Sequence, residues 1–362
     1  MASTRIEVAA SAGAYPVIVG NDIIDTLPAL LDGADLPSQR IFVSSPTVWN
    51  LHGPRLIKVA GSSARRPILI PDGERSKTIQ TAGRVYEALI QAGADRSVVL
   101  IAVGGGVIGD MVGFVAATYL RGVRLAHVPT TLMAQVDSAI GGKVGVNHAL
   151  GKNLIGAFHP PRIVVSDPSL LQTLPRRELR AGLYEVIKYG VIADAALFER
   201  VRAERGAVFN FSGETLASVV TASSRIKADV VSRDERESGL RRILNFGHTL
   251  GHALEAATDY RRLRHGEAVG YGMIAAAALG HARGVTPEAV RNAISGAIAE
   301  LGPLPPVADL KASEVIKATR RDKKVVSGRL HFVAATGLGA TTEITDVTDE
   351  QLRQALRAIG IR

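Results

Sequence analysis

The segment VVLIAVGGGVIGD, residues 98–110, decides how the chain is expected to fold. Its first six residues are apolar, as in a strand that is buried on both faces. The strand runs directly into GGGVIGD, which satisfies the GxGxxG spacing and opens a helical pattern. Glycines in such a turn let a pyrophosphate approach the backbone N–H groups of the helix N-terminus. The segment therefore predicts an α/β sheet with a nucleotide site beside this strand.

Further strand patterns surround this segment, at residues 40–45, 67–70 and 123–128, and a helical pattern covers residues 78–91. This alternation is typical of a sheet of parallel strands. The common Rossmann fingerprint lies on the first strand and is followed about 20 residues later by an acidic residue. Here the corresponding residues are Pro129, Thr130 and Thr131, so a nucleotide site of a less common kind is expected.

Between residues 121 and 160, glycines alternate with polar residues, and we expect loops there rather than core structure. Glycine beside lysine and asparagine offers backbone donors and positive charge, which suit a phosphorylated, hydroxyl-rich ligand. A solvated surface loop is the alternative. The polar residues concerned are Arg121, Thr130, Thr131, Asp137, Lys143, Asn147, Lys152 and Asn153.

Residues 241–267 contain three of the nine histidines of the chain, His248, His252 and His265. Two of them, His248 and His252, stand four apart in a helical pattern and share one helix face, and His265 opens the next helix. Three imidazoles suggest a divalent metal site, but the spacing differs from HExxH and requires a further ligand. Capping or packing of a helix is an equal alternative on these residues alone.

A further ligand could come from residues 178–192, where Glu185 and Lys188 share a helical face. The two side chains could simply form an exposed ion pair. Alternatively, Glu185 could join His248 and His265 in a two-histidine, one-carboxylate zinc site that leaves a coordination position open for substrate.

The composition, 46% hydrophobic and 21% charged over 362 residues, is that of a folded protein of two domains. We place the boundary near Pro175, giving an α/β domain over 1–175 and a mainly helical domain over 176–362. Cysteine is absent, the N-terminus lacks signal-peptide features, and no apolar run is long enough to span a bilayer. A cytoplasmic protein without membrane segments is expected.

The formal charge of +9 raises the question of nucleic acid binding. However, the basic residues are scattered as pairs and aromatic residues make up only 4% of the chain. An anionic small substrate explains the charge as well, and no nucleic acid partner is expected.

Nine motifs occur in one order along nearly the whole chain, and together they resemble the 3-dehydroquinate synthase family of sugar-phosphate cyclases. They are PDGERSK (71–77), GGGVIGD (104–110), RGV (121–123), VPTTLMAQVDSAIGGK (128–143), GKNLIGAFHP (151–160), YEVIKYG (184–190), DERESGLRRILNFGHTLGHA (234–253), HGE (265–267) and RDKK (321–324). The resemblance implies an N-terminal α/β domain that binds NAD and a helical C-terminal domain that binds zinc or cobalt.

The resemblance also implies a role for each matching residue. The implied metal ligands are Glu185, His248 and His265. The implied NAD contacts are Glu74, Lys77, Gly105, Gly106, Val107, Asp110, Thr130 and Thr131, with Lys143 and Lys152. The implied substrate contacts are Asp137, Lys143, Lys188, Lys227, Arg241, Asn245 and His252, and the phosphate would lie among Arg121, Lys152, Asn153 and Arg241, with Lys323 or Lys324.

Two positions depart from the family pattern. Residues Ser44 and Ser45 lack the Asp or Asn expected at the adenosine ribose, and Tyr184 replaces a small residue.

The implied reaction converts 3-deoxy-D-arabino-heptulosonate 7-phosphate into 3-dehydroquinate and phosphate, in a homodimer. Its steps are transient oxidation by NAD, β-elimination of phosphate, reduction and intramolecular aldol closure. Alternatives are another cyclase, making aminodehydroquinate, an inosose or valiolone, and a metal-dependent polyol dehydrogenase. An anion- or nucleic-acid-binding module would leave Glu185, His248 and His265 without a purpose.

Overall fold

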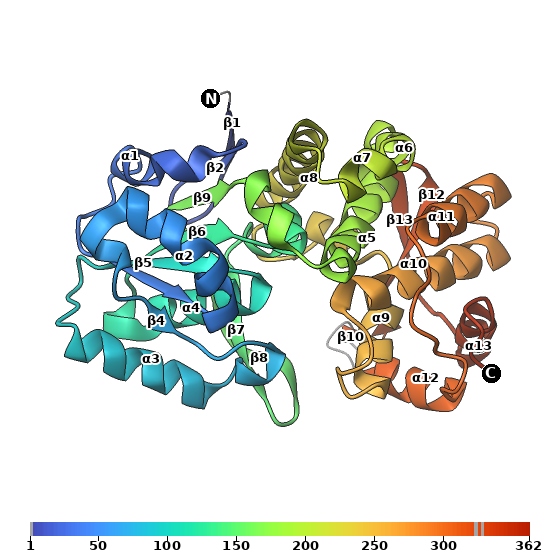
Figure 1. The fold of residues 1–362 in the computed structure, drawn as a ribbon. Helices are drawn as coiled ribbons and strands as arrows, with labels where there is room; N and C mark the ends of the chain where they lie inside the picture. Colours follow the sequence, from blue (N-terminus) through green and yellow to red (C-terminus); the bar gives the residue numbers. More distant parts are fainter. Residues whose placement is uncertain (1–2, 322–324, 327–328) are drawn as a thin grey trace. The chain divides into compact units, whose positions relative to one another are not determined.

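A computed structural model describes residues 3–321, 325–326 and 329–362 of the chain (Figure 1). They divide into two compact units, which we call the first unit and the second unit. The first contains the described part of Met1–Pro175 together with Phe211–Glu235, and the second contains Arg176–Asn210 and the described part of Arg236–Arg362. Lys323 and Lys324, of which one is expected near the phosphate, lie outside the described residues.

Helix α8 (Gly213–Arg233) belongs to the first unit, although the expected second domain includes its residues. It packs against strands β1 (Thr4–Val8) and β2 (Tyr15–Val19) of the first unit. Ser224 Oγ donates to the carbonyl of Gln135, and Lys227 Nζ donates to Asp137, both in the first unit. Side-chain contacts with residues far away in the sequence therefore assign this helix, and helical periodicity cannot foresee them.

The described residues of the first unit form a seven-stranded sheet in the order β1-β2-β9-β6-β5-β3-β4. β1 pairs antiparallel with β2, and the other neighbours are parallel, as the alternation of strand and helix patterns predicts. The strands are β1 (Thr4–Val8), β2 (Tyr15–Val19), β3 (Arg40–Ser44), β4 (Ile68–Leu69), β5 (Val99–Gly104), β6 (Arg124–Pro129) and β9 (Ile163–Ser166).

Helices cover both faces of this sheet (Figure 1). Side chains of β5 alternate between the two cores: Leu100 and Ala102 pack beneath α3 and α4, whereas Ile101 and Val103 pack with α1 and α2. Burial on both faces explains the continuous apolar run of β5. The helices are α1 (Leu27–Asp32), α2 (Pro46–Ala60), α3 (Ile79–Gln91) and α4 (Gly106–Thr118).

Residues 143–158 form a hairpin, whereas the sequence predicts loops there. Strand β7 (Lys143–His148) pairs antiparallel with β8 (Gly151–Phe158), and buried Val144 and Val146 join the core beside α4. The added Cβ of an alanine at Gly113 of α4 would lie 2.2 Å from a Val144 methyl carbon. The glycine-rich pattern reflects this close packing of helix on hairpin as well as ligand binding.

The second unit is mainly helical, as predicted (Figure 1). Helix α10 (His265–Ala282) lies at its centre and contacts α5, α9, α11, α13 and β12. The other described elements are α5 (Arg176–Ala193), α6 (Ala195–Ala203), α7 (Arg205–Phe209), α9 (His248–Ala257), α11 (Glu288–Glu300), α12 (Ala312–Arg321), α13 (Asp349–Arg357), β10 (Val325–Val326), β11 (Arg329–Leu330), β12 (Phe332–Gly337) and β13 (Ala340–Ile344).

Glycines let α10 approach its neighbours at backbone distance. A Cβ at Gly266 would lie 1.9 Å from the carbonyl oxygen of Ala181 in α5. At Gly272 it would lie 1.8 Å from the carbonyl oxygen of Gly247, which precedes α9. These two contacts fix α10 against the helices that carry Glu185 and His248.

Two polar side chains near helix starts make hydrogen bonds to distant parts of the chain. The buried Asp167 carboxylate accepts hydrogen bonds from the N–H groups of Asp22 and Ile24, each at 3.0 Å, and so satisfies donors at the start of the 3-10 helix Ile23–Thr26. Thr286 Oγ1 donates to the Ala335 carbonyl at 2.7 Å and therefore does not cap α11, whose N-cap is Pro287.

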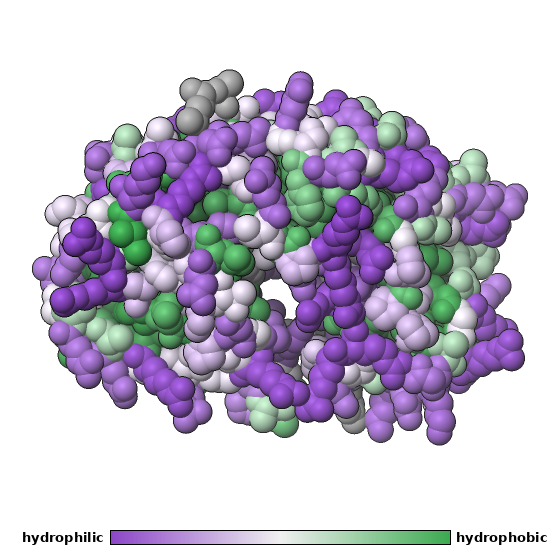
Figure 2. Space-filling model, viewed as in Figure 1, coloured by the Kyte–Doolittle hydropathy of each residue, from purple (hydrophilic) through white to green (hydrophobic). Residues whose placement is uncertain are grey.

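Hydrophilic side chains cover most of the visible surface of each unit (Figure 2). Among the described residues, no helix has the length and apolar character needed to cross a bilayer.

Candidate functional site

Three imidazole rings gather at α9 and α10 in the second unit. His248 is the first residue of α9, His252 lies one turn later, and His265 is the first residue of α10. The ring centroid of His248 is 5.4 Å from that of His252 and 5.2 Å from that of His265. One ring nitrogen from each of the three lies within 4.8 Å of the others. Such spacing suits side chains that converge on one divalent cation.

Glu185, near the middle of α5, brings a fully buried carboxylate to this cluster. Its Oε1 lies 3.6 Å from His248 Nε2 and 3.7 Å from His265 Nε2. These distances are too long for good hydrogen bonds but close to the separation of roughly 3.3 Å between two ligand atoms in a tetrahedral zinc site.

The Glu185 carboxylate is also poorly satisfied by protein groups. Lys188 Nζ contacts Oε2, but among the described residues neither oxygen accepts an aligned hydrogen bond. A buried carboxylate with an orphaned oxygen is costly unless a cation compensates it. The donor set of one carboxylate and two imidazoles therefore fits a divalent metal ion.

Hydrogen bonds fix the orientation of two of these rings. His248 Nδ1 donates to the Phe246 carbonyl at 3.2 Å, and His265 Nδ1 donates to Glu255 Oε2 at 3.0 Å. Because a carbonyl or carboxylate can only accept, the remaining nitrogen of each neutral ring, Nε2, keeps its lone pair. Both Nε2 atoms face Glu185, which favours the predicted ligand set, and the exclusion of His252 from it stays a prediction.

Three other predicted substrate residues belong to the second unit: Lys188 and Arg241 are buried, and Asn245 is partly buried. The Lys188 side chain is buried, with its Nζ 4.9 Å from the centroid of the Tyr189 ring. Arg241 is buried in a short 3-10 helix, residues 240–245. Asn245, in the same turn, donates from Nδ2 to Glu237 Oε1 at 2.6 Å.

The glycine turn of the first unit lies between β5 and α4. Gly105 is the N-cap of α4 and has no side chain to satisfy the first N–H groups of the helix. A Cβ at Gly105 would lie 3.0 Å from a Thr131 methyl carbon, and one at Gly106 would lie 3.0 Å from Ser138 Oγ. The Thr130 N–H donates to the Gly104 carbonyl at 3.0 Å, so β6 ends beside the turn. Open helix donors and absent side chains fit a dinucleotide pyrophosphate.

A second polar cluster lies one turn into α4. Lys77 Nζ contacts Asp110 Oδ2 and Asn153 Oδ1, and the Lys77 side chain is almost fully buried. Burial raises the pKa of Asp110, and the charge of Lys77 opposes that rise. We take Asp110 as ionised because it contacts a cation directly.

The β7–β8 hairpin supplies the rest of this cluster. Asn147 Nδ2 donates to Glu74 Oε1 at 2.7 Å, and the Asn153 N–H donates to Asn147 Oδ1 at 2.9 Å. Lys152 Nζ lies 4.0 Å from the same Glu74 oxygen. The fold thus brings Glu74, Lys152 and Asn153 together, and their contacts with NAD and phosphate stay predictions.

The predicted substrate residues Asp137 and Lys227 form an ion pair within the first unit. Lys227 Nζ donates to Asp137 Oδ1 at 2.6 Å. Because Ser138, the next residue, adjoins Gly106, this pair lies close to the glycine turn.

Two family models match consecutive parts of the chain. The model of the 3-dehydroquinate synthase N-terminal domain matches residues 67–181, and the model of the C-terminal domain matches residues 182–325. A 3-dehydroquinate synthase of Nostoc punctiforme is 44% identical over 353 residues, with 95% of this chain and 96% of the relative covered.

The chain belongs to the 3-dehydroquinate synthase family.

Two solved structures share the fold of this 3-dehydroquinate synthase family member. The 2-epi-5-epi-valiolone synthase ValA of Streptomyces hygroscopicus, with NAD+ and Zn2+ bound, has a TM-score of 0.88 at 29% identity, and 99% of each chain is covered. A 2-deoxy-scyllo-inosose synthase complexed with carbaglucose-6-phosphate, NAD+ and Co2+ has a TM-score of 0.85 at 26% identity, with 98% of this chain and 99% of that chain covered.

Arg121 is not brought to the other predicted phosphate residues of the first unit. It follows the C-terminus of α4, whereas the glycine turn lies at the other end of this 13-residue helix, roughly 20 Å away, and Asp110 lies about 12 Å before the C-terminus. Leu120 and Arg121 both have positive φ, 49° and 69°, an uncommon conformation that the surrounding turn imposes. Lys143 begins β7 and is exposed.

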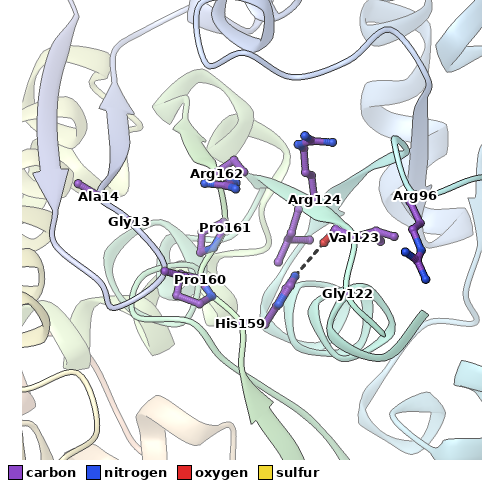
Figure 3. Close-up of a pocket in the computed structure, with 12 residues that line it drawn as sticks. Gly13, Ala14, Arg96, Gly122, Val123, Arg124, His159, Pro160, Pro161 and Arg162 are labelled. Atoms are coloured by element: carbon purple, nitrogen blue, oxygen red, sulfur yellow. Dashed lines mark hydrogen bonds between the residues drawn. The ribbon is translucent and has the colours of Figure 1, made fainter. Parts of the chain in front are cut away.

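A cavity of about 360 Å³ opens near Arg121, where β6 begins and the chain leads into β9 (Figure 3). Arg96, Arg124 and Arg162 line it, and His159 Nε2 donates to the Val123 carbonyl at 2.9 Å. None of the predicted site residues is among the described residues that line it. In Figure 3 the side chains of Arg96 and Arg124 point in different directions and do not converge on one point.

The two departures from the family pattern have structural explanations. Ser44 Oγ donates to the Val103 carbonyl at 2.8 Å and so serves the sheet. The Tyr184 ring packs against Gly270 of α10, where a Cβ would lie 3.2 Å from the ring, and burial raises the tyrosine pKa to about 12.

Sequence reasoning missed two acidic residues of the second unit, Glu237 and Glu255. Glu237 lies within the quoted motif DERESGLRRILNFGHTLGHA and binds Asn245. Glu255 stands seven residues after His248 on α9, so helical periodicity could have placed both on one face. The hydrogen bond between His265 and Glu255 depends on the turn between α9 and α10, so the sequence could not predict it.

Proposed function

We propose that this chain is a 3-dehydroquinate synthase, which converts 3-deoxy-D-arabino-heptulosonate 7-phosphate into 3-dehydroquinate and phosphate. The strongest support is the geometry of Glu185, whose Oε1 faces Nε2 of His248 and of His265 in a chain 44% identical to a named synthase. The proposed cofactors are NAD and one zinc or cobalt ion, since structural relatives at 29% and 26% identity hold NAD+ with Zn2+ and with Co2+.

When bound, NAD would accept and return a hydride, and the metal ion would polarise the substrate alcohol and the ketone derived from it. Glu185, His248 and His265 hold the metal in this proposal, and the open helix N-terminus at Gly105 holds the pyrophosphate. A ketone beside the C–H bond makes that hydrogen acidic, which permits β-elimination of phosphate.

The side chains of this chain then supply charge and proton transfer. In this proposal Lys152 and Asn153 donate to the phosphate, and Arg241 stabilises its departing charge. His252, beside the metal ligands, moves a proton at the substrate oxygen. After reduction, ring opening and aldol closure need mainly a pocket that holds the reacting carbons in place.

A homodimer is part of the proposal, and the position of Arg121 supports it. Lys152 lies near the start of β8, and His159, which contacts the Val123 carbonyl, directly follows its end. The seven residue steps between them span about 23 Å at 3.3 Å per residue. Arg121 therefore lies too far from Lys152 to contact the same phosphate within one chain, but a second copy could supply it. We place the enzyme in the cytoplasm, where NAD and sugar phosphates occur.

Phosphate release tests the activity. Incubated with the heptulosonate phosphate, zinc and trace NAD, the protein is expected to release many equivalents of phosphate per NAD, because the hydride returns to the substrate. Absorbance of NADH at 340 nm stays flat while a coupled assay measures phosphate. Stoichiometric NADH would indicate a polyol dehydrogenase instead, and turnover only of other sugar phosphates would indicate a different cyclase.

Lys152→Ala and Arg241→Ala are expected to lower kcat/KM by roughly 10- to 150-fold, the effect of losing a charge-assisted hydrogen bond of about 1.5–3 kcal/mol. Zinc content should stay unchanged, because neither side chain is a proposed ligand. Arg96→Ala, an exposed arginine beside the cavity of Figure 3, is the control and should turn over normally. Normal turnover by both test variants would refute the proposed phosphate site.

A further inference from the structure

We propose that Glu255 is a positioning residue for the metal site: its carboxylate holds His265 in the tautomer and orientation that present Nε2 to the metal. This inference rests on the proposed metal site and adds a residue that neither the motifs nor the relatives assign. His265 Nδ1 donates to Glu255 Oε2 at 3.0 Å, and Glu255 is 3% exposed.

Helix α9 carries both the metal ligand His248 and the positioning residue Glu255. His248 and Glu255 are seven residues apart, two helical turns, and therefore lie on the same face. At the C-terminal end of α9, the Tyr260 N–H donates to the Glu255 carbonyl at 2.8 Å, which anchors the turn that leads back to His265. One helix thus carries a metal ligand at its start and the partner of another ligand at its end.

The two histidine ligands are held by different kinds of acceptor. The Phe246 carbonyl that binds His248 Nδ1 is neutral, whereas the Glu255 carboxylate that binds His265 Nδ1 is an anion. A carboxylate at Nδ1 increases the electron density at Nε2 and strengthens its bond to a metal. It also adds a second negative charge, after Glu185, to balance the two positive charges of the ion.

His265 needs this support because its side chain is 35% exposed, whereas that of His248 is 11% exposed. Packing alone restrains an exposed ring less, so a hydrogen bond has more influence on where Nε2 points. Glu267, two residues later, is used differently: it is fully buried, accepts from Arg177 and caps the backbone of Arg264. Glu267 therefore fixes the start of α10, whereas Glu255 fixes the orientation of the His265 ring.

Zinc affinity, measured by competition with a coloured chelator, tests the role. Glu255→Ala is expected to weaken zinc binding about 10- to 100-fold, as removal of such partners does elsewhere. Glu255→Gln should lose less, because its amide oxygen still accepts from Nδ1. Asp259→Asn removes the same charge from an exposed residue nearby and should bind zinc like the parent. The visible spectrum of the cobalt form should shift in Glu255→Ala and not in Asp259→Asn.

Glu185→Ala separates a positioning role from direct ligation, because it removes a proposed ligand. Equal affinity of Glu255→Ala and the parent would overturn the inference, and so would a loss as severe as that of Glu185→Ala, which would make Glu255 a ligand itself. Thermal unfolding of the metal-free variants checks that they fold. If the parent protein binds no zinc, the proposed function fails instead.

Discussion

Replacing His248 with alanine is expected to remove the metal and the activity together. The variant loses an Nε2 ligand that faces Glu185 Oε1 at 3.6 Å, and the remaining carboxylate and His265 cannot hold the ion alone. Activity should fall on the order of 10³-fold or more, since a metal contributes several kcal/mol of transition-state stabilisation. Metal analysis of the purified protein and phosphate release measure the two effects.

The matched variant is His252→Ala, on the same face of α9. It should keep stoichiometric zinc and turn over about 10²- to 10⁴-fold more slowly, the contribution of a positioned proton-transfer group. Both rings belong to one cluster, so similar disturbance of the helix is expected in the two variants. If His252→Ala lost zinc and His248→Ala kept it, His252 and not His248 would be the metal ligand.

Replacing Gly266 with alanine is expected to disrupt the second unit. The new Cβ would lie 1.9 Å from the Ala181 carbonyl oxygen, so α10 must move away from α5. Overpacking costs about 1–3 kcal/mol, and more when backbone must separate. We expect the melting temperature to fall by at least about 5 °C. Because Gly266 follows His265, the same movement takes a ligand away from Glu185, and zinc affinity should fall too.

Gly296→Ala is the control for this prediction. Gly296 lies inside α11, and a Cβ there would meet no atom within 4 Å. Alanine is a better helix former than glycine, so this variant should gain about 0.5–1 kcal/mol and bind zinc normally. If Gly266→Ala were as stable as Gly296→Ala, the close contact of α10 with α5 would not matter for stability.

The parts of the fold that neighbouring residues control could be predicted from the sequence. The apolar run before GGGVIGD gave β5, the glycine turn and α4, because burial on both faces and glycine geometry are local requirements. The spacing of His248 and His252 placed them on one helix face for the same reason. The resemblance added Glu185, which periodicity could offer only as one possible partner.

Contacts between distant residues decided the rest. Ser224 and Lys227 bind the first unit, which assigns α8 to it although its sequence is that of any amphipathic helix. Residues 143–158 form a hairpin because Val144 packs on Gly113, a contact that the polar, glycine-rich pattern conceals.

The site shows the same division. By itself the sequence determined which residue types are present and which of them share a helix face, since backbone geometry repeats every few residues. Only the tertiary structure decided that Glu185 Oε1 faces two Nε2 atoms, that Glu255 holds His265, and that Arg121 lies far from Lys152. Those distances depend on how whole helices pack, and packing is set by side chains that are remote in the sequence.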